Sequence, residues 1–60
     1  MRLWTLFELM RLTKIELCSL TRTITVAMPA LPEGSPDRAN ALENLRLIRL
    51  ELARRDVSPH

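Results

Sequence analysis

The feature that most constrains the fold of this chain is a proline-rich stretch near its middle. Residues 28–38, MPALPEGSPDR, contain three of the four prolines and the only glycine. Proline disfavours helix at the residue before it, yet it suits the first position of a new helix. The stretch therefore predicts a connection over 29–35 between two helical halves, with a type I turn at residues 31–34. A connection of this length suits helices that pack antiparallel.

Helix starts are marked three times along the chain. Thr5 and Thr13 each precede a glutamate by three residues, which is the spacing of a capping box. Ser35 is a good N-cap residue, and the proline after it suits the first helical position. One domain over 1–60 is expected, with helices at about 6–11, 14–28 and 36–55 and a frayed tail at 56–60.

Residues 21–26, TRTITV, fit two secondary structures. Their β-branched side chains alternate with polar ones, which is typical of a strand. Since no other segment predicts a strand, the backbone hydrogen bonds of such a strand would have to form between chains. We therefore favour a helix here and keep an intermolecular strand as the alternative.

Apolar residues at helical spacing predict the surfaces that pack. Their 3–4 spacing is typical of helices that lie nearly antiparallel. The sequence predicts an all-α fold, an antiparallel helical hairpin preceded by a short N-terminal helix. The residues expected in the core or at a dimer interface are Leu17, Leu20, Ile24, Ala41, Leu45, Ile48 and Leu52.

A chain of 60 residues needs support beyond its own core. Domains of this size bury only about 60% of the surface that the unfolded chain exposes. Cys18 is the only cysteine, so no internal disulfide can form, and with His60 alone it cannot make a zinc site. Cys18 is expected to be a small buried apolar residue rather than a reactive thiol. Oligomerisation remains, and we expect a homodimer that forms a four-helix bundle.

The charged residues form no catalytic grouping. Glu43 and Glu51 lie on different sides of the third predicted helix and are interpreted as solvated surface. We expect no enzymatic activity, no cofactor and no metal. The interpretation that follows is a homodimeric protein–protein interaction or adaptor module. Arginine outnumbers lysine eight to one, which fits a small bacterial protein from a GC-rich genome.

The alternative function is a small regulator that binds nucleic acid. Arg38, Arg46 and Arg49 fall along one side of the third predicted helix and form a basic ridge suited to phosphate. Glutamates lie at pairing distance along the same helix, and no aromatic residue accompanies the ridge for base stacking. Both points favour a structural role for these arginines.

The sequence contains no membrane span. A span needs about 20 consecutive apolar residues, and charges interrupt every apolar run here. A cytoplasmic protein with a reduced thiol is expected. Trp4 and Phe7 near the N-terminus resemble an interfacial anchor, but a short helix with Glu8 suits a lid over the hairpin or part of a dimer interface better.

Overall fold

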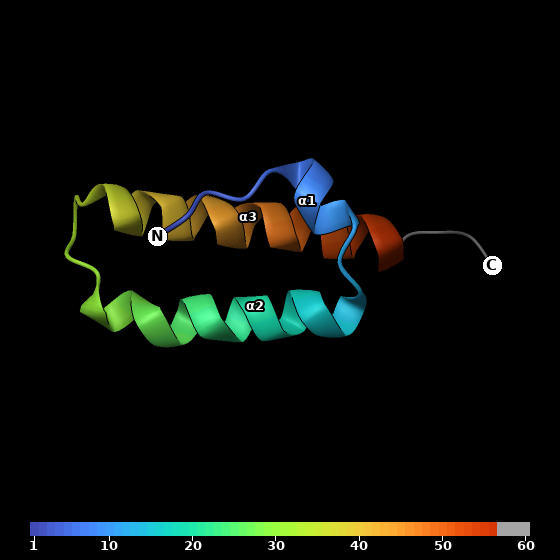
Figure 1. The fold of residues 1–60 in the computed structure, drawn as a ribbon, viewed down its shortest axis with the longest axis horizontal. Coiled ribbons are helices and arrows are strands. Elements are labelled where there is room, and N and C mark those ends of the chain that lie inside the picture. The colour runs from blue at the N-terminus through green and yellow to red at the C-terminus, as the bar shows by residue number, and fades with distance from the viewer. Residues whose placement is uncertain (57–60) are drawn as a thin grey trace.

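The computed structural model describes residues 1–56, and all regular structure in that range is helical (Figure 1). The helices are α1 (Leu6–Met10), α2 (Lys14–Ala27), the 3-10 turn η1 (Met28–Ala30) and α3 (Pro36–Asp56). The prediction of an all-α hairpin with a short N-terminal helix is confirmed. Asp56, expected in the tail, ends α3, and the remaining predicted tail at 57–60 lies outside the described residues. None of the described helices has the length and apolar character to span a membrane.

Residues 21–26 belong to α2, so the helix prediction is confirmed and the strand alternative is wrong. All three threonines of this stretch donate their hydroxyls to carbonyls one turn earlier, and that of Thr23 reaches the Ser19 carbonyl at 3.0 Å. The hydroxyl of Thr21 donates to the Leu17 carbonyl at 2.9 Å, and that of Thr25 donates to the Thr21 carbonyl at 2.8 Å. Helical packing against the rest of the chain therefore outweighs the strand preference of these side chains.

Both predicted capping boxes are present. The N–H of Glu8 donates to Thr5 Oγ1 at 3.2 Å, and the N–H of Thr5 donates back to Glu8 Oε1 at 2.9 Å. Thr13 and Glu16 repeat the exchange at 3.1 and 2.9 Å, and these bonds lower the pKa of Glu16. α1 and α2 therefore begin where the sequence places them, because each start is a local hydrogen-bonded unit.

The connection between α2 and α3 differs from the prediction by one residue. The N–H of Ser35 donates to the Pro32 carbonyl at 3.2 Å, so the turn spans 32–35 rather than 31–34. Gly34 takes its third position with φ of 77°, the positive value that a type II turn requires there. The predicted type I turn is therefore wrong, and the glycine is needed for its backbone angle.

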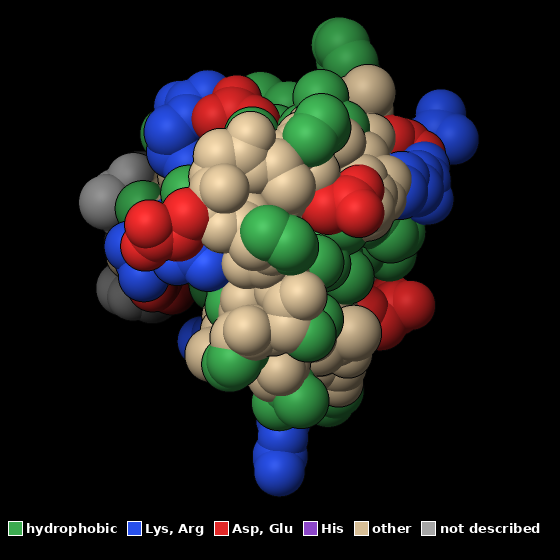
Figure 2. All heavy atoms as spheres, turned by 90° about the vertical axis from the view of Figure 1, so that its left-hand side faces the viewer, with side chains coloured by type: hydrophobic (Ala, Val, Ile, Leu, Met, Phe, Trp, Pro, Cys, Tyr) green, Lys and Arg blue, Asp and Glu red, His purple; other side chains and the backbone are tan. Residues whose placement is uncertain are grey.

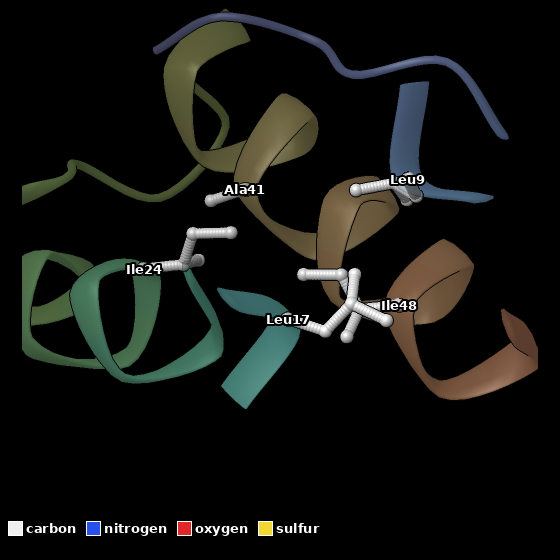
Figure 3. Packing of buried hydrophobic residues seen from close by; sticks show 5 residues of the cluster. All are labelled: Leu9, Leu17, Ile24, Ala41 and Ile48. Atoms are coloured by element: carbon white, nitrogen blue, oxygen red, sulfur yellow. The ribbon is translucent and has the colours of Figure 1, made fainter. Parts of the chain in front are cut away.

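α3 lies between the other elements and contacts both α1 and α2 (Figure 1). α2 runs antiparallel to it on one side. Residues 1–12, here called the N-terminal segment, run along another side in the same direction as α3. The core cluster joins all three elements (Figure 3): Leu9, Leu17, Ile24, Ala41 and Ile48.

Candidate functional site

The first side of α3 faces α2, and the residues predicted for the core or dimer interface lie where these two helices meet. Four of these are buried and three are half-buried against them. The buried ones are Leu17, Ile24, Ala41 and Ile48, and the half-buried ones are Leu20, Leu45 and Leu52. Leu9 of α1 joins the same cluster, although it was not among the residues predicted for the core. These apolar residues of α2 and α3 pack on each other within one chain, which leaves little of their surface for a second copy.

The second side of α3 binds the N-terminal segment through side-chain amides. Asn44 is completely buried, and its amide bonds the segment twice. Its Oδ1 accepts from the Trp4 N–H at 2.8 Å, and its Nδ2 donates to the Arg2 carbonyl at 2.7 Å. One turn earlier, Asn40 Nδ2 donates to the Met1 carbonyl at 2.9 Å. These bonds satisfy backbone groups of an extended stretch that has no strand to pair with.

The C-terminal end of the same side binds the end of α1. Nη2 of Arg55 points at three carbonyls there, with the shortest contact of 2.7 Å to Leu12. Its Nε donates to the carboxylate of Glu51 at 2.7 Å, and Arg54 binds the same carboxylate through two bonds of 2.7 and 2.8 Å. A cation at a helix C-terminus also interacts favourably with the helix dipole.

Glu51 is buried, so its predicted role as solvated surface is wrong. Hydrogen bonds from Arg54 lower its pKa to about 2 against the effect of burial, with those from Arg55 adding to the shift. The carboxylate stays charged because two guanidinium groups surround it.

A signal for this second side is present in the sequence. Asn40, Asn44, Glu51 and Arg55 are spaced four, seven and four residues apart, which is a polar stripe along one helix face. Asparagine is also a poor helix former, so two of them in a helix interior indicate a role outside helix formation. A search for apolar seams alone misses this stripe.

The third side of α3 has no partner among the described residues and is called the outer face. It consists of Ala39, Leu42, Glu43, Arg46, Arg49, Leu50 and Ala53. Leu42 and Leu50 are 52% and 50% exposed. The face combines apolar, acidic and basic side chains.

The predicted arginine ridge divides between two environments. Arg38 is half-buried and directs Nη1 at the Met28 and Leu31 carbonyls of the connection, at 3.4 and 3.3 Å. Arg46 lies on the outer face and binds Glu43 through two bonds of 2.7 and 2.8 Å. This pairing lowers the pKa of Glu43 and raises that of Arg46. Arg49 is exposed on the same face.

The N-terminal segment carries its own exposed apolar side chains. Leu3, Leu6, Phe7 and Met10 are exposed, and Phe7 is 80% exposed. Within α1, Leu9 is buried in the core, whereas Leu6, Phe7 and Met10 are exposed. The segment therefore covers α3 with one side and presents apolar surface on the other.

Cys18 is exposed, so the prediction of a buried residue is wrong. It lies in a shallow depression of α2 beside Lys14, Ile15 and Arg22. Cys18 follows the buried Leu17 and is therefore turned about 100° from it around the helix, where no other element covers it.

Metal-ligating side chains do not gather in the described range: within 1–56 no three His, Cys, Asp or Glu residues are placed to hold an ion. Comparison of the chain with protein-family models, curated proteins and solved structures finds no match. A functional interpretation therefore depends on the surfaces of this chain and on their charge.

Proposed function

We propose that this protein is a non-enzymatic protein–protein interaction module that acts as a homodimer. The observation that carries the proposal is the apolar surface left by folding. Eight large hydrophobic side chains among the described residues are exposed in a chain of 60 residues. Four of them belong to the N-terminal segment and two to the outer face of α3, and contiguous exposed apolar patches are typical of interfaces. Two copies bring together two α2–α3 hairpins, which contain four long helices.

The N-terminal segment supports the proposal because its apolar side is held in a defined position. Asn44 and Arg55 fix the two ends of the segment on α3 through hydrogen bonds to its backbone. Every buried side-chain nitrogen and oxygen atom in the described range has a hydrogen-bond partner. A surface that is already ordered loses less entropy when a partner binds it.

Nucleic-acid binding is the second candidate function, and the contacts of its arginines favour it less. Arg38 and Arg46 already bind carbonyls and a carboxylate within the chain. Figure 2 shows the end of the molecule that contains the connection, where basic side chains lie beside acidic ones with hydrophobic side chains between them. The formal net charge is only +2. Phosphate binding instead favours an uninterrupted basic surface.

Light scattering after size exclusion tests the homodimer. The chain has a mass of 6.9 kDa, and we expect twice this mass at micromolar concentration. A monomer at every concentration up to the solubility limit would contradict the proposal.

A gel-shift series with duplex DNA and RNA at increasing salt tests the second candidate. Binding that weakens steeply as salt rises would favour nucleic-acid binding instead, because phosphate contacts release counterions. The proposed location is the cytoplasm, where an exposed thiol such as Cys18 stays reduced.

A further inference from the structure

The outer face of α3 has a symmetric order of side chains about Arg46. Ala39 and Ala53 lie seven residues to either side of Arg46, and Leu42 and Leu50 lie four residues to either side. Glu43 and Arg49 lie three residues to either side, with opposite charges. Since each residue rises about 1.5 Å along the axis, members of a pair are equally distant from Arg46.

This order fits an antiparallel copy of the same helix. About a two-fold axis at Arg46, each residue comes level with the other member of its pair in the second copy. Leucine then lies level with leucine, alanine with alanine, and Glu43 with Arg49 of the second copy. The last pairing occurs twice in the dimer because the axis repeats it.

A parallel arrangement lacks this complementarity. It would place Glu43, Arg46 and Arg49 each level with the same residue of the second copy, so that all three contacts join like charges. In the antiparallel arrangement only Arg46 meets itself. Its guanidinium already shares two hydrogen bonds with Glu43, which offsets the repulsion.

The shape of the face also suits a helix crossing. Leu42, Arg46 and Leu50 are spaced by four residues and form one ridge, and Ala39 and Ala53 leave low positions beside its two ends. A ridge of this kind packs into the groove between ridges of a second helix.

We infer that the outer face of α3 is the homodimer interface, where a second copy packs antiparallel about a two-fold axis at Arg46. This inference rests on the proposed function. It assigns the exposed Leu42 and Leu50 to the dimer contact and leaves the apolar side of the N-terminal segment free on both copies.

Charge exchange between positions 43 and 49 tests the inference. The dimer dissociation constant is measured by sedimentation equilibrium for the wild type, for E43R, for R49E and for the double variant. Controls are E33R in the connection and R22E on α2, which change the net charge equally at exposed positions off the outer face. Circular dichroism confirms that each variant is folded.

We expect each single variant to raise the dissociation constant about tenfold, because two attractive pairs become two repulsive ones. The controls should leave it within about twofold. The double variant should return it to near the wild-type value, because the pairing is restored with its charges exchanged. In that variant the carboxylate introduced at position 49 also lies three residues from Arg46 and replaces the original partner.

The outcomes separate the inference from the proposed function. If the wild type dimerises but E43R and R49E raise the dissociation constant no more than their controls do, the assigned interface is wrong and the homodimer remains. If both single variants raise the dissociation constant and the double variant does not restore it, the antiparallel pairing is wrong. A wild-type monomer at all concentrations overturns the proposed homodimer and the inference together.

Discussion

Replacement of Asn44 by alanine should remove the main attachment of the N-terminal segment. The substitution deletes one hydrogen bond from the Trp4 N–H and one to the Arg2 carbonyl. Each contributes about 1 kcal/mol, and a partly buried backbone group left without a partner adds to the cost. We expect Asn44→Ala to lower the free energy of unfolding by about 2–3 kcal/mol. A chain of this length has about 3–9 kcal/mol in total, so the loss is large.

Urea denaturation measures this loss with two independent signals. Trp4 is the only tryptophan and lies in the attached segment, so its fluorescence follows release of the segment. Far-UV circular dichroism follows the helices. We expect the fluorescence transition of Asn44→Ala to occur at lower urea than its dichroism transition, because α2 and α3 keep their own contact. Protein concentration is held constant, since dimer formation also adds stability.

The matched control is Asn40→Ala, which removes only the bond to the Met1 carbonyl from a half-buried position. It should cost about 1 kcal/mol or less. A loss of less than about 0.5 kcal/mol for Asn44→Ala, half of a typical hydrogen bond, would contradict the attachment of the segment through Asn44. A loss no larger than that of Asn40→Ala would contradict it as well.

Three further changes have defined outcomes. Ile48→Ala should lower the free energy of unfolding by about 2–5 kcal/mol in urea denaturation. Leu45→Ala should lower it less, because Ile48 is buried and Leu45 is half-buried, and equal losses would contradict this. The pKa of Glu51 is held at about 2 against an ordinary 4.5, so its stabilisation is complete above pH 4.5 and is lost as the pH falls toward 2. Glu51→Gln should flatten that part of the acid unfolding curve, and an unchanged curve would contradict the ion pairs. Gly34→Ala should lower the stability by about 1 kcal/mol because of the positive φ alone, since no atom lies close to the added methyl group. An unchanged melting temperature would contradict this.

The sequence predicted those features that neighbouring residues determine. Thr5 and Thr13 each bond a glutamate three residues on, so the starts of α1 and α2 follow from the sequence. Ser35 likewise caps α3, with its Oγ accepting from the Arg38 N–H at 3.1 Å. The hairpin follows from the prolines between the two helices. The turn register was missed by one residue, because Gly34 suits the fourth position of a type I turn over 31–34 as well as the third position of a type II turn over 32–35.

Only the tertiary structure decided which polar residues are buried. Asn44 bonds residues 40 and 42 positions away, and Arg55 reaches carbonyls 43 to 46 positions away. No local pattern specifies such partners, because they exist only once the N-terminal segment lies on α3. The same placement buries Glu51 and leaves Cys18 uncovered. Helix boundaries depend on hydrogen bonds between near neighbours, whereas burial depends on which distant segment covers each helix face, and that is determined only by folding.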